Sequence, residues 1–329
     1  MNKIEFGDCR AIMRQWAASG IKAQTCVTSP PYFGLRDYGH EGQIGLEKTP
    51  DEYIAAMVEV FRCVRDVLAD DGTVWLNIGD SYASYRDGKA TPDTTRGDST
   101  GTLVPKGSAR NRMASTFQGS GVKHKDLIGI PWMLAFALRA DGWYLRQDII
   151  WHKPNPMPES VRDRCTKAHE YIFLLSKSEK YFFDSNAMKE PATNAGKRVL
   201  LGKKSFSKGQ AAGAGIAPSG NGNAEFYDVP ETRNRRSVWT VTTKPYKGAH
   251  FATFPPDLIE PCILAGSRPN NIVLDPFMGS GTTAQVAIEN GREYLGCELN
   301  KAYEELQVNR INLATEKLNA VNCQADLFN

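Results

Sequence analysis

The sequence contains no apolar run long enough to cross a membrane. Its apolar stretches, such as Tyr171–Leu175, fall far short of the roughly 20 residues that a membrane-spanning helix requires. The first residues, Met1–Glu5, do not begin an apolar signal-peptide core. We therefore expect a cytoplasmic protein that makes no membrane contact.

Closely spaced cysteines are also absent. The seven cysteines stand at positions 9, 26, 63, 165, 262, 297 and 323, and no two have Cys-x-x-Cys spacing. Structural zinc sites and redox-active sites depend on such spacing, so we expect no metal site. An odd number of scattered cysteines is typical of a protein from a reducing cytoplasm.

The chain has little net charge, +3, but its basic residues are unevenly distributed. Residues 86–125 hold eight Lys and Arg against three Asp, and residues 186–247 hold eleven against four acidic residues. The rest of the chain is therefore acidic in balance. Two basic segments on an acidic body are typical of a polyanion-binding surface, although basic solvated loops would give the same composition.

Hydrophobic periodicity predicts strands that alternate with helices, which favours an α/β fold with a mostly parallel sheet. A long amphipathic helix begins at Asp51 and is expected to end at Asp71-Gly72. Residues 84–125 and 186–236 lack periodicity and are rich in small and polar residues, which predicts loops. The predicted strands are Ile4–Phe6, Thr25–Thr28, Thr73–Ile78, Tyr144–Trp151, Tyr171–Ser176, Asn271–Asp275 and Glu293–Glu298. Tyr171–Ser176 is expected to pair in a hairpin with Lys180–Phe183. The other predicted helices are Cys9–Ala18, Ile130–Arg139, Pro256–Ala265, Thr282–Asn290 and Tyr303–Leu318.

A glycine turn near the C-terminus predicts a nucleoside cofactor. Gly279-Ser280-Gly281 follows the strand that ends at Asp275 and precedes a helix that begins with Thr282. The free N–H groups of such a helix suit a carboxylate or a phosphate. The next strand ends in Glu298, 23 residues after Asp275, close to the spacing at which an acid reaches ribose hydroxyls.

The same turn lacks the lysine that a phosphate-binding P-loop needs, because Gly281 occupies that place. A third glycine of the dinucleotide pattern is also missing. Asp275 suits a cofactor with an ammonium group and a positive charge, and S-adenosylmethionine has both, together with a carboxylate for the helix. The alternative is that Asp275 only forms the turn.

A second motif, Thr28-Ser-Pro-Pro-Tyr32, follows a buried strand near the N-terminus. Pro30 and Pro31 make the backbone rigid, Ser29 offers a hydroxyl, and Tyr32 offers a flat face for stacking. These groups suit a planar ring that bears an exocyclic amine, although an isolated motif of this kind is often a plain turn. We expect the sheet to bring this clamp and the glycine turn together.

Taken together, residues 28–32 and 275–283 resemble the amino-methyltransferases that modify exocyclic amines in DNA, in the motif order of their β group. The resemblance covers roughly residues 1–83, 127–185 and 237–318. It implies a Rossmann-like, seven-stranded sheet with permuted motif order. Residues 1–185 and 237–329 would form the two parts of a catalytic core, with a basic loop at 84–125, and residues 186–236 would form a target-recognition segment.

The resemblance also implies roles for individual residues. Ser29, Pro30, Pro31 and Tyr32 would be the catalytic clamp. Asp275 would hold the methionine amine of S-adenosylmethionine and Glu298 the ribose hydroxyls, with Phe277 packed on the cofactor. The remaining residues expected at the cofactor are Asp8, His250, Phe251, Phe254, Pro276, Gly279, Gly281, Thr282 and Asn300.

The predicted reaction is direct methyl transfer to a base flipped out of double-stranded DNA. Ser29 at the first clamp position resembles the cytosine-N4 members of this family, which implies the N4 amine of cytosine as the target, and adenine N6 is the alternative. A companion restriction endonuclease would fit this activity, and the protein would be a monomer or a homodimer. The rival interpretations are a non-catalytic DNA-binding protein, a methyltransferase for RNA or protein, and a nucleotide hydrolase, which the missing lysine disfavours.

Other polar and aromatic residues are interpreted as structural. His152 and Lys153 stand near prolines and are expected only to position the backbone. His40 and His124 are expected in solvated loops. Three tryptophans are expected to pack in the core, namely Trp75, Trp143 and Trp151.

Overall fold

The structure is a computed structural model that describes residues 1–35, 39–40, 42–83, 121–200, 226–243 and 254–326. These residues form two compact units. One comprises residues 1–184 and 237–329, and the other comprises residues 185–236. Within the described ranges, no helix combines the length and the apolar character that crossing a membrane requires.

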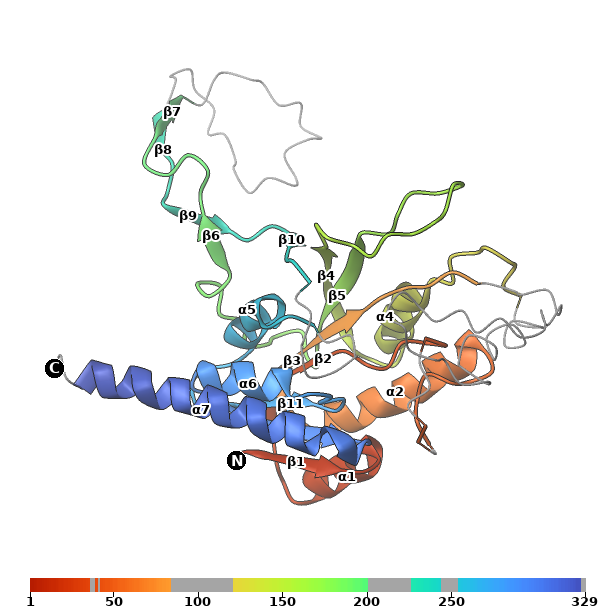
Figure 1. Cartoon of the computed structure of the whole chain (residues 1–329). Helices are drawn as coiled ribbons and strands as arrows, with labels where there is room; N and C mark the ends of the chain where they lie inside the picture. The colour runs from red at the N-terminus through yellow and green to blue at the C-terminus, as the bar shows by residue number, and fades with distance from the viewer. Residues whose placement is uncertain (36–38, 41, 84–120, 201–225, 244–253, 327–329) are drawn as a thin grey trace. The chain divides into compact units, whose positions relative to one another are not determined.

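The larger unit contains an eight-stranded sheet (Figure 1) with the order β1-β12-β11-β2-β3-β5-β4-β10. Every neighbouring pair is parallel except the two that involve β5. The predicted α/β class with a mostly parallel sheet is therefore confirmed, and the short edge strand β10 adds an eighth strand to the seven expected. The strands are β1 Lys3–Phe6, β2 Ala23–Thr28, β3 Leu68–Ile78, β4 Tyr144–His152, β5 His169–Ser176, β10 Val238–Thr240, β11 Ile272–Asp275 and β12 Glu293–Glu298.

The sheet order brings distant parts of the chain together. Strands β2 and β11 are parallel neighbours, with Thr25 opposite Val273 and Cys26 opposite Leu274. Parallel neighbours end at the same edge of a sheet, where ligands of α/β proteins usually bind. The clamp that follows β2 and the glycine turn that follows β11 therefore emerge side by side, as the sequence predicted.

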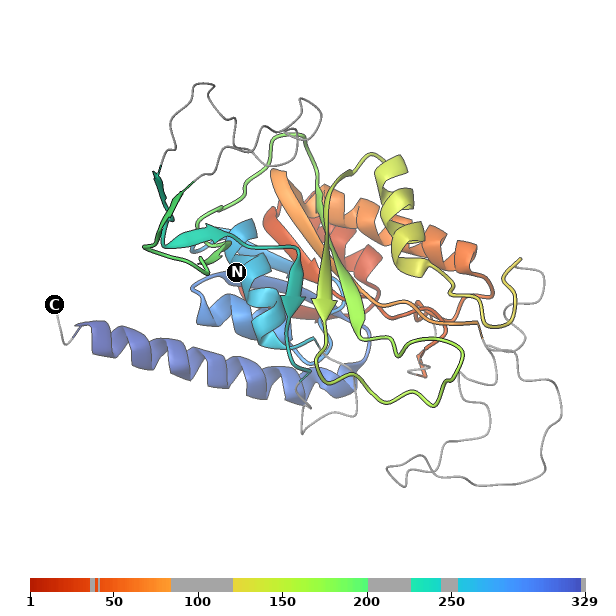
Figure 2. The same cartoon turned by 90° about the horizontal axis from the view of Figure 1, so that it is seen from above.

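Helices cover both faces of the sheet (Figure 2), with α2 and α4 on one side and α5, α6 and α7 on the other. The main core cluster joins α1, α2 and α4 to the sheet through fully buried side chains such as Met13, Phe61 and Leu134. The helices are α1 Cys9–Ala18, α2 Pro50–Val67, α4 Ile130–Ala140, α5 Pro256–Gly266, α6 Thr282–Glu289 and α7 Glu304–Asp326, with a 3-10 turn at Lys301–Tyr303.

Three predicted boundaries in this unit are wrong: the end of α2, the start of β3, and the end of α7, which continues to Asp326 instead of Leu318. Helix α2 begins as expected, with the Thr49 hydroxyl accepting from Glu52 N at its first turn, but it ends at Val67. Leu68 is buried, pairs with Ala23 and begins β3, so the chain enters the sheet before Gly72.

The predicted hairpin of residues 171–176 with 180–183 is also absent. Strand β5 already has β3 and β4 as its two partners. Residues 180–183 form no strand, and Phe182 N donates to Asp71 O.

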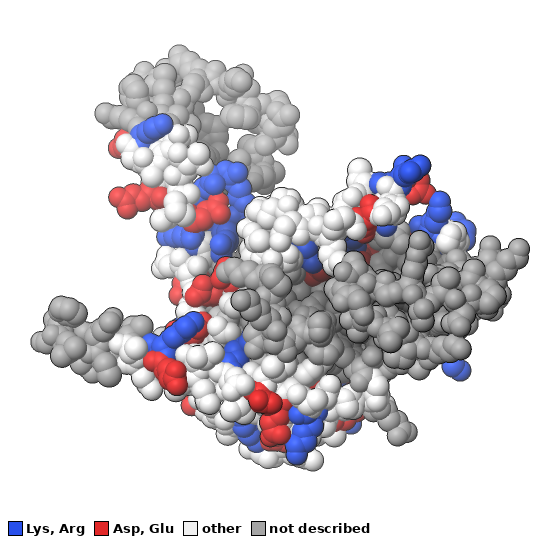
Figure 3. Space-filling view, viewed as in Figure 1, with Lys and Arg blue, Asp and Glu red and all other residues white. Residues whose placement is uncertain are grey.

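The smaller unit is built from two short antiparallel ribbons. Its strands are β6 Lys189–Pro191 paired with β9 Thr232–Asn234, and β7 Arg198–Leu200 paired with β8 Phe226–Asp228. Lys and Arg side chains gather over β6 and β9 (Figure 3). One of them, Arg233, donates to Glu190 across the ribbon at 2.8 Å.

Candidate active site

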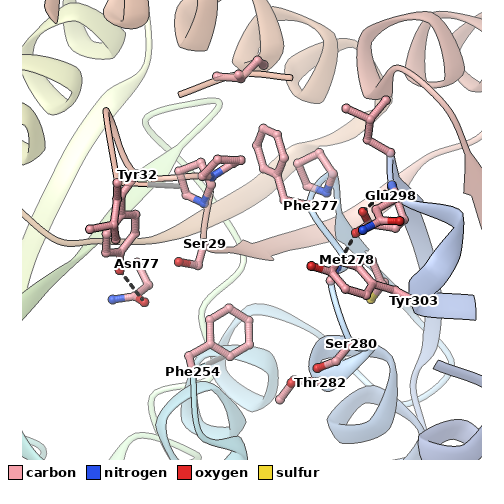
Figure 4. A pocket seen from close by; sticks show the side chains of 18 of the residues that line it. Ser29, Tyr32, Asn77, Phe254, Phe277, Met278, Ser280, Thr282, Glu298 and Tyr303 are labelled. Carbon is pink, nitrogen blue, oxygen red and sulfur yellow. Dashed lines mark hydrogen bonds between the residues drawn. The ribbon is translucent and has the colours of Figure 1, made fainter. Parts of the chain in front are cut away.

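The larger unit encloses a cavity of about 740 Å³ where β2 and β11 end. Figure 4 shows Ser29, Tyr32 and Asn77 on one side of it and Met278, Ser280, Thr282 and Glu298 on the other. Its size is within the usual range for a small-molecule site. Of the residues expected from the sequence, the following line it: Asp8, Ser29, Pro30, Pro31, Tyr32, Phe254, Pro276, Phe277, Gly279, Thr282, Glu298 and Asn300.

The glycine turn is shaped by two left-handed backbone conformations. Gly279 has φ of 54° and Gly281 has φ of 86°, values that residues with a side chain rarely adopt. Gly281 caps α6, and a Cβ there would lie 3.4 Å from the backbone of Gln307. Gly281 does not line the cavity, where it would meet a cofactor, and instead shapes the turn and its packing on α7, so its direct cofactor contact stays a prediction.

Glu298 is the acid of the cofactor side. Its Oε2 accepts a hydrogen bond from Gly279 N at 2.7 Å, and its Oε1 accepts from Asn300 N at 2.8 Å. Burial raises the pKa of this carboxyl to about 7. Each oxygen keeps a lone pair for another donor, so the carboxylate is suited to a pair of ribose hydroxyls.

Asp275 occupies a different position from the one expected. Its side chain is buried and does not line the cavity. Its Oδ1 accepts from Thr28 Oγ1 at 2.6 Å and from Phe277 N at 3.0 Å, and its Oδ2 accepts from Thr283 Oγ1 at 2.6 Å. These bonds agree with the alternative interpretation of Asp275 as a turn-former, and its contact with the methionine amine stays a prediction.

Two other hydroxyls on the cofactor side differ in whether they already have a hydrogen-bond partner. Thr282 Oγ1 accepts from the buried Arg310 guanidinium. Ser280 Oγ is buried, and among the described residues it has no hydrogen-bond partner. Because Ser280 lines the cavity beside the start of α6, this hydroxyl is available to a ligand carboxylate.

The clamp forms the other side of the cavity. Pro31 O accepts a hydrogen bond from Tyr53 Oη at 2.9 Å, which ties the clamp to α2. Tyr32 Oη donates to Glu170 Oε2 at 2.7 Å. Burial, reinforced by the Glu170 carboxylate, raises the pKa of Tyr32 well above its ordinary value, so the hydroxyl stays protonated and keeps donating.

Sequence reasoning missed Asn77 and Glu170 and set aside Lys153 and Trp151, and all four line the cavity. The Lys153 ammonium pairs with Glu170 Oε1 and lies 4.2 Å from the centre of the Trp151 ring. Their positions in the sequence could have indicated them, because these residues stand at or near the ends of β3, β4 and β5. Trp151 is buried as expected, and His40, expected to be solvated, also lines the cavity.

Two residues of the cofactor set need separate mention. Asp8 lines the cavity, but its carboxylate also caps α1 and pairs with Arg10 at 2.6 Å. His250 and Phe251 lie outside the described residues, whereas Phe254 is described and lines the cavity.

The hydrogen-bonding and apolar groups that line the cavity fit S-adenosylmethionine. Glu298 offers an acceptor for ribose, Ser280 and the start of α6 offer donors for a carboxylate, and Phe277 offers an apolar face. Within the described ranges, no three His, Cys, Asp or Glu side chains come together as a metal site. The cavity thus combines groups that suit an organic cofactor on one side with a polar and aromatic clamp on the other.

Comparison with known proteins agrees with this geometry. The N6/N4 methyltransferase family model, described as DNA methylase, matches residues 23–309. The Type II methyltransferase M.SmaI of Serratia marcescens is 47% identical over 312 residues, which cover 94% of this chain and 90% of that protein.

Two solved structures share the fold. The PvuII DNA methyltransferase, described as cytosine-N4-specific, matches with a TM-score of 0.57 at 17% identity, over 97% of this chain and 91% of that chain. The M1.HpyAVI complex with S-adenosylmethionine matches with a TM-score of 0.51 at 18% identity, over 95% of this chain and all of that chain (100%). The chain therefore belongs to the N6/N4 DNA methylase family, the S-adenosylmethionine-dependent enzymes that methylate exocyclic amines of DNA.

Proposed function

We propose that this enzyme methylates the N4 amine of a cytosine that has been flipped out of double-stranded DNA. One observation carries the proposal: the clamp and the glycine turn open into a single cavity from adjacent strand ends. Ser29 at the first clamp position favours cytosine over adenine, through the resemblance described above. The cytosine-N4 specificity of the PvuII enzyme, which shares the fold, is consistent with this choice.

The clamp would hold the target base and its amine. Extruding a base costs a few kcal/mol, and stacking on an aromatic ring such as Tyr32 offsets about 1–3 kcal/mol of it. Ser29 Oγ and the Pro30 carbonyl would accept hydrogen bonds from the amine and orient its lone pair. The gain in rate would then come from positioning and electrostatics, without a strong base.

The opposite side of the cavity would hold S-adenosylmethionine, which supplies an activated methyl group. Glu298 would accept from the ribose hydroxyls, Phe277 would pack on the cofactor, and Ser280 with the start of α6 would receive the carboxylate. Asp275 would act from behind the cavity wall by holding the turn in place.

Residues 185–236 form a separate unit, and in the described part of it Lys and Arg outnumber Asp and Glu. Positive charge supplies the sequence-independent share of DNA affinity. We assign this unit to target recognition. The relatives named Type II methyltransferases support a role in a restriction-modification system, with a companion endonuclease that cuts the unmethylated site.

Nucleoside mass spectrometry on DNA from cells that express the protein tests the proposal. N4-methylcytosine is the expected product, and it should be absent from cells that express the Tyr32→Ala variant. N6-methyladenine in place of N4-methylcytosine would show that the enzyme acts on the other base that the family modifies. No modified base in either culture would overturn the proposed activity.

A further inference from the structure

A charged pair lies behind the clamp and none of the roles above uses it. Glu170 and Lys153 line the cavity, and their side chains are only 16% and 18% exposed. One Glu170 oxygen accepts from Tyr32 Oη and the other pairs with Lys153. The carboxylate therefore bridges the aromatic ring of the clamp and a lysine that directly follows β4.

The packing leaves this bridge little freedom. Gly79 follows β3, and a Cβ at that position would lie 2.7 Å from Tyr32 Cε2 and 3.2 Å from Glu170 Cδ. Asn77 Nδ2 donates to Tyr171 O at 3.1 Å, and its Oδ1 lies 3.5 Å from Tyr32 Oη. Tyr32 and Glu170 are thus pressed together against the end of β3.

Two costs explain why both members of the pair are present. A half-buried carboxylate without a counter-charge is unfavourable, and the Lys153 ammonium supplies that charge. A tyrosine hydroxyl removed from water needs an acceptor, and Glu170 supplies one whose charge strengthens the bond. A ring that is held by its hydroxyl and by close packing can adopt few orientations. A ring on which a base stacks must have such a fixed orientation.

We propose that Glu170 and Lys153 are positioning residues that fix the Tyr32 ring in the orientation needed to stack the flipped base. This inference rests on the proposed function, because it gives Tyr32 the stacking role. Neither residue touches the cofactor in this scheme. Their loss should therefore slow methyl transfer without weakening S-adenosylmethionine binding.

The test measures single-turnover methylation of a recognition duplex and, separately, the affinity for S-adenosylmethionine by calorimetry. Glu170→Gln should slow transfer roughly tenfold, the size expected for one charge-assisted hydrogen bond. In a Tyr32→Phe background the same change should have little further effect, because the hydroxyl is already gone. Lys153→Met should be slower than Glu170→Gln, since it leaves the carboxylate unpaired.

The double variant Lys153→Met/Glu170→Gln gives the sharpest result. It removes both charges, so its rate should recover to that of Glu170→Gln alone. Glu289→Gln is the matched control. Glu289 forms an ion pair with Lys317 at 3.0 Å, and neither residue lines the cavity. Multiplicative losses in the double variant, or an equal effect of Glu170→Gln with and without the Tyr32 hydroxyl, would overturn the inference. If Tyr32→Ala left transfer unchanged, the stacking role in the proposed function would fall as well.

A second, independent observation concerns Met157. Among the large apolar side chains of the described residues it has the greatest exposed fraction, 85%, and yet it lines the cavity, so it lies at the mouth. Its neighbours Pro156 and Pro158 each fix one backbone dihedral. Asn155 anchors the segment by donating to Thr243 O and accepting from Thr243 N, both at 3.1 Å.

An exposed apolar side chain on an anchored segment beside a base-binding cavity suits one task. When a base leaves the duplex, its neighbours lose a stacking partner, and apolar wedges such as Met are known to occupy disrupted base steps. We infer that Met157 enters the duplex and fills the space that the flipped base leaves. This inference also rests on the proposed function, since it requires base flipping.

The test compares methylation of two duplexes, one fully paired and one with an abasic site opposite the target base. Met157→Ala should slow transfer roughly tenfold on the paired duplex and at most about twofold on the abasic one, where flipping is easier. Met157→Leu should lose less of the rate on the paired duplex than Met157→Ala, because leucine keeps a large apolar side chain at this position. Leu127→Ala is the control, because Leu127 is 51% exposed but does not line the cavity.

If Met157→Ala lost methylation rate equally on the two duplexes, or lost none on either, the inference that Met157 acts as a wedge would be overturned. Absence of methylation by the wild-type enzyme on both duplexes would instead reject the proposed function, and the wedge with it.

Discussion

Thr28 Oγ1 donates a hydrogen bond of 2.6 Å to Asp275 Oδ1, across 247 residues of chain. This bond joins the last residues of β2 and β11, the strands from which the clamp and the glycine turn emerge. Thr283 Oγ1 holds the other carboxylate oxygen from the first turn of α6. The two halves of the active site are therefore held in register by one buried carboxylate.

Removing the donor of this bond should loosen both halves. Thr28→Val keeps the side-chain shape and suits a strand, but it takes one hydrogen bond from the carboxylate. We expect unfolding free energy, measured in denaturant, to fall by about 2 kcal/mol, the usual worth of a hydrogen bond to a charged group. The control is Thr315→Val, whose exposed hydroxyl donates to Ile311 O within α7, and which should change stability by less than about 0.5 kcal/mol.

Substitutions of Asp275 separate a structural role from a direct cofactor contact. Asp275→Ala leaves two buried hydroxyls and one N–H without their acceptor, so stability and S-adenosylmethionine affinity should fall together. The loss of stability should be about 2–4 kcal/mol. Asp275→Asn retains one acceptor oxygen and should be milder in both measurements. A large loss of affinity at unchanged stability in either variant would restore the direct contact.

Glu298 should make cofactor binding depend on pH. Its pKa is raised to about 7 by burial, so the stability contributed by the protonated carboxyl is lost as the pH rises through about 7. Ribose hydroxyls that donate to Glu298 would favour the ionised form and lower this pKa. Affinity for S-adenosylmethionine should therefore rise between roughly pH 6 and pH 8, and binding in that range should release a proton.

Calorimetry in two buffers with different ionisation enthalpies measures this proton. The Glu298→Gln variant provides the baseline, because it retains any titration of the cofactor itself. Identical proton release by the wild type and the variant would argue against a contact between Glu298 and the ribose.

Gly79 provides a steric test of the clamp. The added Cβ of Gly79→Ala would lie 2.7 Å from Tyr32 Cε2, so the Tyr32 ring must move away from the end of β3. We expect methyl transfer to fall more than about tenfold while S-adenosylmethionine affinity stays within about twofold, because the displacement is confined to the base side. Parallel losses of rate and affinity would show that the two sides of the cavity are less separate than the geometry indicates.

The two motifs were predictable because each is local in the chain. Strand, glycine turn, helix and terminal acid follow one another within residues 271–298, and the clamp is four residues long. We expected the two motifs to be adjacent because a cofactor bound at the glycine turn must face a base held in the clamp. The burial of Asp275 was not fixed by these patterns, since it depends on Thr28, a partner in another strand.

The support behind the clamp could not be found in the same way. Glu170 faces Trp151 in the register of the antiparallel pair β4 and β5, and that register brings the ion pair with Lys153 together. Periodicity shows that a segment is a strand but not which strand is its neighbour. The predicted hairpin assigned β5 a wrong partner, so the importance of Glu170 was hidden.

The way residues 185–236 leave and rejoin the larger unit has a practical consequence. Asp184 N is bonded to Ala265 O, and Ser237 O accepts from Ile150 N, so both junctions are fastened to the fold that carries the chemistry. The segment between these two points contains no strand of the eight-stranded sheet, so it can be exchanged without changing that sheet. Since we propose that this unit recognises the target, chimaeras that graft the corresponding segment of a relative between Asp184 and Ser237 are expected to methylate new target sequences with unchanged catalysis.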